Sequence, residues 1–384
     1  MNYYIDIATQ SLNKVGEELC GDKVEIFRDT NRTVIVLADG LGSGVKANIL
    51  ATMTTKIAGT MLIKGESIEE TVDTLMKTLP VCQVRKIAYS TFGVISIDPE
   101  GNCVMLEYDN PPIFILRKGT ILSIKKRKIS FDGKIVQRSS FHLQEGDSLT
   151  LCSDGVIHAG VGETLNHGWE WEHVASFLSR QSVKTADQLN QRLIDACAKL
   201  YNYHPGDDTT AVTVKLRAPE NLSLFTGPPI DPDDDSYLVK KFMKQGGKKI
   251  VCGGTAANIL SRELHREIET CLDYLDPEIP PVAKMKGIDL VTEGVLTLQK
   301  TIDRLEAFRL KLPDYDPARQ DGATRLAKLL INDSTHIQFF IGRAINPAHQ
   351  NPDFPAALSI KMHVVESLME ELKKIGKEVQ VHRF

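Results

Sequence analysis

The sequence lacks the cysteine patterns that build metal or disulfide frameworks. Its seven cysteines include no CxxC pair and no cysteine–histidine spacing of the zinc-site kind. Several stand within apolar runs, as in Leu151-Cys152 and Val251-Cys252, where cysteine behaves as a small hydrophobic residue. The pattern excludes the usual zinc modules and predicts reduced thiols.

The sequence also lacks a strong charge of one sign and a long hydrophobic run. Its formal net charge of -4 gives no general attraction to nucleic acid or to an anionic membrane. No apolar run approaches the roughly 20 residues that span a bilayer. The opening residues, Met1 to Asp6, have neither the basic nor the apolar part of a signal peptide. We therefore expect a cytoplasmic protein with no nucleic-acid or membrane partner.

The length predicts two domains, because 384 residues exceed what one hydrophobic core usually organises. Hydrophobic residues make up 42% and charged residues 25%, which is ordinary for a globular protein. Residues 218–236 contain Gly227-Pro228-Pro229 and the run Asp233-Asp234-Asp235, a composition typical of a linker. The predicted domains are therefore residues 1–217 and 237–384.

The two domains have different patterns of secondary structure. Residues 1–217 read as short strands at close spacing with helical blocks at 45–63, 67–79 and 171–201, which favours an antiparallel sheet or sandwich. Ser67 and Glu70 have the spacing of a capping box at a helix start. Residues 237–384 alternate strands with helices, which predicts a smaller α/β domain with a mostly parallel sheet.

Carboxylates recur beside glycines at predicted strand ends in the first domain. The positions are Asp22, Asp39, Asp154 and the pair Asp207-Asp208. A rigid sheet presents hard oxygen ligands to magnesium or manganese in this way, and a cation offsets the repulsion among gathered carboxylates. The alternative for any one Asp-Gly pair is a simple turn.

The glycines after Asp39 invite a comparison with nucleotide-binding loops. Gly40, Gly42 and Gly44 follow a buried strand and precede a helix. The dinucleotide fingerprint spaces its glycines as GxGxxG and needs a second parallel strand, whereas the following strands read as antiparallel. No Gly-Lys-Ser/Thr follows either, so a Walker loop is excluded here.

Taken in order, these motifs resemble the metal-dependent protein phosphatases of the PPM (phosphatase 2C-like) family, and most closely its bacterial branch typified by the sporulation stage II protein E phosphatase. The resemblance covers about residues 1–217. It rests on these segments: Asp39-Gly40-Leu41-Gly42-Ser43-Gly44, Asn110-Pro111-Pro112, Leu151-Cys152-Ser153-Asp154-Gly155-Val156 and Gly206-Asp207-Asp208-Thr209-Thr210. It implies an α+β fold, an αββα sandwich of two antiparallel sheets flanked by helices.

The resemblance also implies a site and a reaction. Two divalent ions, Mn²⁺ or Mg²⁺, would be held by the side chains of Asp22, Asp39, Asp154 and Asp207 and by the carbonyl of Gly40. Asp39 would bridge the two ions, and Asp39 and Asp154 are the residues assigned to catalysis. A bridging water would attack phosphoserine or phosphothreonine of a partner phosphoprotein.

Other positions differ from the family pattern or have lesser roles. Asp208 would lie just outside the ligand set. Leu41 stands where larger relatives have a histidine thought to protonate the leaving oxygen, and a lone histidine such as His158 more often has a structural role. Arg28 and Lys23 are the candidates for binding the substrate phosphate. The alternative function is a catalytically silent phosphatase fold used for binding, against which the retained carboxylates argue.

The second domain offers weaker signals. Gly253, Gly254 and Thr255 at a helix start have free N–H groups suited to an anion, although small residues there equally allow close packing. A polar loop over 346–352 follows a predicted strand at 337–341. We expect a regulatory domain that binds a small-molecule or protein ligand and controls the phosphatase, with a second enzyme as the alternative. A homodimer through the helix at 45–63 is one interpretation of its apolar residues, and plain core is the other.

Overall fold

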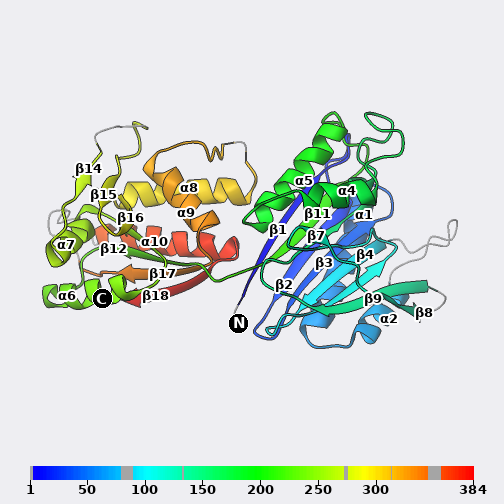
Figure 1. Cartoon of the computed structure of the whole chain (residues 1–384), viewed down its shortest axis with the longest axis horizontal. Helices are drawn as coiled ribbons and strands as arrows, with labels where there is room; N and C mark the ends of the chain where they lie inside the picture. The colour runs from blue at the N-terminus through cyan, green and yellow to red at the C-terminus, as the bar shows by residue number, and fades with distance from the viewer. Residues whose placement is uncertain (1–2, 79–89, 132–133, 272–275, 313, 345–355) are drawn as a thin grey trace. The chain divides into compact units, whose positions relative to one another are not determined.

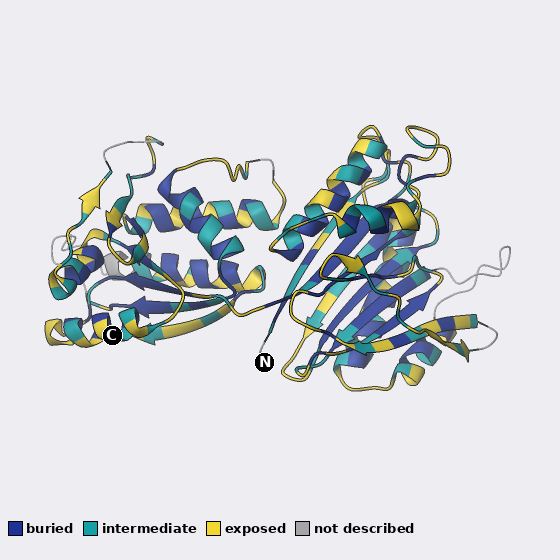
Figure 2. Cartoon of the chain, viewed as in Figure 1, coloured by how far each residue is buried: buried dark blue, intermediate teal, exposed yellow. Residues whose placement is uncertain are grey.

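The computed structural model describes residues 3–78, 90–131, 134–271, 276–312, 314–344 and 356–384 (Figure 1). The chain forms two compact units, Met1–Ala218 and Pro219–Phe384. Each unit has a hydrophobic core of its own, visible as buried strands and buried helix faces in Figure 2. The predicted loop over 346–352 lies outside the described residues.

The first unit contains two antiparallel sheets. One has six strands in the order β2-β3-β4-β5-β9-β8, and the other has five in the order β1-β11-β10-β6-β7. The strands are β1 (Tyr4–Leu12), β2 (Asp22–Arg28), β3 (Thr33–Gly40), β4 (Ser90–Ile97), β5 (Asn102–Tyr108), β6 (Phe114–Arg117), β7 (Thr120–Ile121), β8 (Arg127–Phe131), β9 (Lys134–His142), β10 (Ser148–Cys152) and β11 (Thr209–Arg217). The helices are α1 (Gly44–Ile63), α2 (Ile68–Thr78), α3 (Asp154–Ile157), α4 (Trp171–Ser179) and α5 (Ala186–Leu200).

Three apolar layers hold this unit together. Alternate side chains of the two sheets, among them Ile35, Ile95 and Val212, form the central core. Helices α1 and α2 cover the outer face of the six-stranded sheet, and α4 and α5 cover that of the five-stranded sheet. The arrangement is the αββα sandwich that the resemblance implies, and the prediction of an α+β fold is confirmed.

Local signals account for two helix starts. The amide of Glu70 donates to Ser67 Oγ at 3.1 Å and its carboxylate accepts from the Ser67 amide at 3.2 Å, which is the predicted capping box. The region 171–201 is predicted as one helical block, but the structure divides it. A second capping box, formed by Thr185 and Gln188, starts α5.

The second unit is built on one sheet of seven strands. Their order is β14-β15-β16-β13-β12-β17-β18; β16, β13, β12, β17 and β18 run parallel, and β14 and β15 are antiparallel additions. The strands are β12 (Asn221–Thr226), β13 (Lys248–Cys252), β14 (Glu269–Thr270), β15 (Ala283–Met285), β16 (Ile288–Thr292), β17 (His336–Ile341) and β18 (Glu378–Arg383). The helices are η1 (Pro232–Asp234), α6 (Asp235–Lys244), α7 (Gly254–Leu264), α8 (Val295–Arg309), α9 (Gly322–Asn332) and α10 (Ala356–Lys374).

Helices cover both faces of this sheet. Side chains of α6 and α7 pack with Phe225, Val251 and Phe340 on one face. Side chains of α8, α9 and α10 pack with Leu224 and Phe339 on the other. The mostly parallel α/β domain is thus confirmed.

The predicted linker over 218–236 is wrong in its first part. Asn221–Thr226 form β12, which is hydrogen-bonded to β13 on one side and to β17 on the other. All residues of β12 except Asn221 are buried. The prediction failed because the strand has only six residues and lies between Pro219 and Gly227-Pro228-Pro229. Proline and glycine therefore dominate the composition of this segment, which is typical of a linker.

The described residues contain neither a membrane-spanning helix nor a disulfide bond. None of their helices combines the length and the hydropathy needed to cross a bilayer. The six cysteines among them form no disulfide.

Candidate metal centre

Aspartates from both sheets of the first unit come to the same edge of the sandwich. Asp22 opens β2 and lies directly opposite Asp39, the last residue but one of β3. Asp154 opens α3 just after β10, and Asp207 and Asp208 immediately precede β11, the strand paired with β10. Each sheet therefore contributes carboxylates to one place.

Four of these aspartates line a cavity of about 470 Å³. This size is within the range of small-molecule sites. The cavity is lined by Asp39, Leu41, Gly42, Ser90, Thr91, Tyr108, Asp109, Asp154, Asp207 and Asp208. Asp22 is 4% exposed and is not among these lining residues, although its charge acts on theirs.

The carboxylates raise one another's proton affinity. Burial raises the pKa of Asp39 to about 9, and the charges of Asp22, Asp154, Asp207 and Asp208 act in the same direction. Burial also raises the pKa of Asp22 to about 7, against the lowering influence of the hydroxyls of neighbouring residues. The pKa of Asp207 is raised by burial and then by Asp154. The raised pKa values mean that these carboxyl groups favour binding of a proton or of another cation.

The donor set fits a hard divalent cation in its chemistry. Both carboxylate oxygens of Asp22 are buried and accept no hydrogen bond, although the hydroxyls of Ser153 and Thr210 are close enough to influence its pKa. Unsatisfied buried carboxylate oxygens are costly, and a cation would satisfy them. Within the described residues no three acidic, histidine or cysteine side chains already surround one point as a metal requires. Binding would therefore draw the carboxylates together.

Two glycines let the segments that carry Asp39 and Asp154 pack closely against their neighbours. A Cβ atom on Gly40 would lie 2.0 Å from the carbonyl oxygen of Ala47 in α1. A Cβ atom on Gly155 would lie 2.2 Å from the carbonyl oxygen of Asp208. The glycines next to Asp39 and Asp154 are thus required by packing, whatever they contribute to binding.

Replacing Gly40 by alanine is expected to lower the free energy of unfolding of the first domain by about 3 kcal/mol, because backbone atoms would have to move to admit the methyl group. Both tryptophans of the chain, Trp169 and Trp171, belong to this domain, so urea unfolding followed by tryptophan fluorescence reports on it alone. Gly206→Ala is the matched control, since its Cβ would meet nothing closer than 4.0 Å. Equal stability of the two variants would contradict the packing argument.

Residues 29–217 match the sequence profile of the family described as stage II sporulation protein E. The first domain of the chain belongs to this family. The resemblance noted in the sequence is thereby confirmed, and the domain is of the PP2C phosphatase type. A comparison with curated protein sequences gave no match.

Solved structures similar to the chain include three bacterial examples. The phosphatase domain of SpoIIE from Bacillus subtilis has a TM-score of 0.44 at 20% identity, covering 56% of this chain and 94% of that chain. The RsbU and RsbW domains of a Mycobacterium tuberculosis protein have a TM-score of 0.49 at 18% identity, covering 62% and 67%. The serine/threonine phosphatase of S. agalactiae has a TM-score of 0.42 at 19% identity, covering 55% and 99%. The family assignment rests on the sequence profile.

The structure gives the remaining candidate residues of this SpoIIE-type domain different places. Leu41 lines the cavity. Lys23 is next to Asp22 in β2, whereas Arg28 lies at the opposite end of that strand and donates to the carbonyl of Ile5 at 3.3 Å. Arg28 is therefore an unsuitable phosphate ligand. His158 ends α3 and is exposed.

Sequence reasoning missed four polar residues that line the cavity, namely Ser90, Thr91, Tyr108 and Asp109. Asp109 has a φ of 48°, a conformation that is uncommon outside glycine and that aspartate tolerates. Asp109 lies beside the cavity because its neighbour Asn110 is held there. The side-chain amide of Asn110 donates to the carbonyl of Cys152 at 3.0 Å, and Cys152 is two residues before Asp154. The residues Asp109-Asn110-Pro111 indicate a turn in the sequence. Cys152, to which Asn110 is hydrogen-bonded, is 42 residues away, so the sequence does not show that this turn borders the cavity.

Asp208 holds two backbone segments rather than offering free oxygens. Its Oδ2 accepts from the amide of Gly21 at 2.8 Å, and its Oδ1 accepts from the amide of Lys14 at 3.0 Å. Asp22 directly follows Gly21, so Asp208 fixes the start of β2. The expected place of Asp208 just outside the ligand set stays a prediction.

Replacing Asp208 by asparagine is expected to cost about 1–2 kcal/mol of unfolding free energy, because an amide accepts at one of the two positions only. Hydrogen exchange at the amides of Gly21 and Lys14 should speed up before any global change. Asp73→Asn, on the exposed face of α2, is the control and should leave both amides protected. Unchanged protection in the Asp208 variant would show that the carboxylate does not hold these segments.

Proposed function

We propose that the first domain is a metal-dependent serine/threonine protein phosphatase that hydrolyses phosphoserine or phosphothreonine in a partner protein. Its family supports phosphatase function in general. The observation that carries the proposal is the gathering of Asp22, Asp39, Asp154 and Asp207 from two sheets, together with the two buried oxygens of Asp22 that accept no hydrogen bond.

The position of these carboxylates and the family match support the metal-binding assignment. Asp22, Asp39, Asp154 and Asp207 would hold two divalent ions, Mn²⁺ or Mg²⁺, with the carbonyl of Gly40 as a further oxygen ligand. When bound, such ions supply positive charge to the transferring phosphoryl group and activate water for its hydrolysis. No covalent enzyme intermediate is required by this chemistry.

The chain's own residues orient the ligands and admit the substrate. The Thr210 amide donates to Ser153 Oγ at 2.9 Å and the Ser153 amide donates to the Thr210 carbonyl, so the start of α3 is tied to β11. The Tyr201 hydroxyl donates to the Gly155 carbonyl at 2.7 Å and fixes the turn after Asp154. The hydroxyls of Ser90 and Thr91 border the cavity where the phosphate ester would enter.

We assign a regulatory role to the second domain. Its parallel sheet is wound on both faces by helices, an architecture that commonly binds ligands at the carboxyl ends of its strands. Gly253 at the start of α7 has a φ of 111°, a conformation that favours glycine, whereas a Cβ atom on Gly254 would meet nothing within 4 Å, so close packing does not require glycine at position 254. A ligand at Gly253, Gly254 and Thr255 stays a prediction.

The test is hydrolysis of matched phosphopeptides by the full chain. Phosphoserine and phosphothreonine peptides should be turned over with Mn²⁺ and not with a chelator, and the same peptides carrying phosphotyrosine should react far more slowly. p-Nitrophenyl phosphate serves as the general phosphatase substrate. Absence of turnover of every substrate by folded protein at all Mn²⁺ concentrations would favour the silent binding module instead.

A further inference from the structure

The winding of the second domain points to a ligand position at its parallel strands. From β12 the chain proceeds to β13 and β16 on one side, and then to β17 and β18 on the other. The direction of winding therefore reverses between β12 and β17. In doubly wound sheets, ligands bind outside the carboxyl ends of the strands at such a reversal.

The loops at this reversal are fixed by backbone contacts. The amide of Gly342 donates to the Thr226 carbonyl at 3.0 Å, and the amide of Ala344 donates to the Pro228 carbonyl at 3.1 Å. A Cβ on Gly342 would lie 2.1 Å from the Pro228 oxygen, so only glycine fits there. Arg343 consequently leaves β17 at a defined position, and its amide donates to the Phe384 carbonyl at 3.0 Å.

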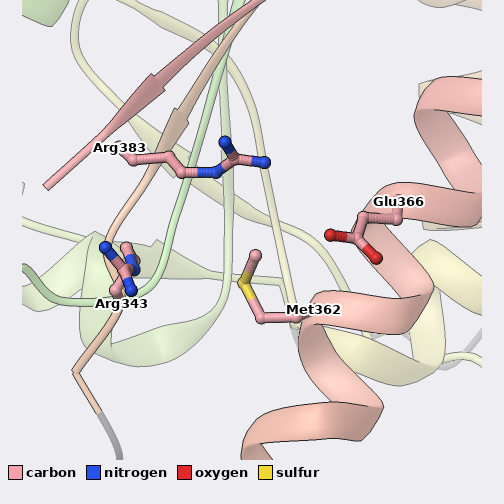
Figure 3. Close-up of a pocket in the computed structure, with 4 residues that line it drawn as sticks. All are labelled: Arg343, Met362, Glu366 and Arg383. Carbon is pink, nitrogen blue, oxygen red and sulfur yellow. The ribbon is translucent and has the colours of Figure 1, made fainter.

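A pocket of about 410 Å³ lies beside these loops, lined by Arg343, Met362, Glu366 and Arg383. Figure 3 shows Met362 and Glu366 projecting from one helix, α10, toward the space that the two arginines border from the strand side. Ile341, at the end of β17, is opposite Arg383 in register, which brings the two guanidinium-bearing segments together. Neither guanidinium has a hydrogen-bond or ion-pair partner within the described part of the chain.

The charge of this region favours an anion. Lys361 precedes Met362 on α10, is half-buried, and donates from Nζ to the Gly342 carbonyl at 3.2 Å. Two arginines and this lysine outnumber the single carboxylate of Glu366. Guanidinium groups match the oxygens of phosphate in geometry, Glu366 can accept hydrogen bonds from hydroxyls, and Met362 offers apolar contact.

We propose that this pocket binds a small phosphate monoester that carries hydroxyl groups, with its phosphate against Arg343 and Arg383 and a hydroxyl on Glu366. The site is distinct from the metal centre, which belongs to the other domain. Sugar phosphates and nucleoside monophosphates share this chemistry, and the pocket volume suits molecules of their class.

The experiment is calorimetric titration of the full chain in the presence of a chelator, so that a metal centre takes up no phosphate. Ribose 5-phosphate, AMP, inorganic phosphate and ribose are the probes. We expect ribose 5-phosphate or AMP to bind more tightly than inorganic phosphate, and ribose not to bind. Whichever of ribose 5-phosphate and AMP binds more tightly shows whether the natural ligand is a sugar phosphate or a nucleotide.

Variants separate the proposed contacts. Arg343→Gln and Arg383→Gln should each weaken binding of the phosphate ester about tenfold or more. Glu366→Gln should weaken binding of the ester but strengthen binding of inorganic phosphate, because it removes a negative charge and leaves only a weaker, neutral acceptor for the hydroxyl. Lys373→Gln, an exposed position on the same helix, is the matched control with the same loss of charge. No binding of any phosphate probe at millimolar concentration, or equal affinities in the arginine variants and the control, would overturn the proposal.

Discussion

Asp39→Asn and Asp154→Asn are each expected to lower Mn²⁺-dependent hydrolysis of p-nitrophenyl phosphate by about 1,000-fold or more. Each substitution removes a negatively charged carboxylate from the lining of the cavity, while leaving a side chain of nearly the same shape. Asp39 should be the more sensitive position, because it is assigned to bridge both ions. The measurement is steady-state kcat and KM over a range of Mn²⁺ concentrations.

The matched control for both substitutions is Asp195→Asn. Asp195 is exposed on α5, where it accepts a hydrogen bond from Gln191, and it takes no part in the cavity. It should keep full activity. Restoration of activity in Asp39→Asn or Asp154→Asn by raised Mn²⁺ alone would reveal a role in affinity only, whereas undiminished activity would contradict the assigned site.

Asp39→Asn should also stabilise the metal-free first domain, by about 1–3 kcal/mol at neutral pH. In the folded chain Asp39 is held near Asp22, Asp154, Asp207 and Asp208, and burial and repulsion raise its pKa to about 9. Folding must therefore bury a charge among like charges or take up a proton, and asparagine avoids both costs. Urea unfolding in a chelator, followed by tryptophan fluorescence, measures the difference.

Added Mn²⁺ reverses the order of stability. The wild-type domain should gain stability with Mn²⁺ in proportion to its binding, and Asp39→Asn should gain little. Asp195→Asn should behave as the wild type throughout. If Asp39→Asn were less stable than the wild type without metal, the carboxylates would not be mutually repulsive and the electrostatic account of the site would fail.

Much of the site was predictable because its signals are local. Asp39-Gly40 follows five consecutive apolar residues, Val34–Ala38, and the capping box of Ser67 and Glu70 needs only four consecutive residues. The gathering of the aspartates was not predictable from spacing, since it depends on β2 pairing with β3 and β10 with β11. The family resemblance supplied this step, and likewise the αββα order of layers.

What the sequence did not reveal depends on distant partners. Asp109 reaches the cavity through the hydrogen bond of Asn110 to Cys152, 42 residues away in the chain. Strand β12 was read as linker because its central place depends on β13 and β17 rather than on its own short sequence. The arginines of the second-domain pocket are separated by α10 in the chain and meet only through the pairing of β17 with β18.

Equilibrium binding of Mn²⁺ to the full chain, with the bound ions examined by electron paramagnetic resonance, tests the central claim most directly. The account predicts two ions per chain that are magnetically coupled in the wild type, and loss of the coupled pair in Asp39→Asn with normal binding in Asp195→Asn. Absence of bound Mn²⁺ in the wild type, or an unchanged pair in Asp39→Asn, would contradict it.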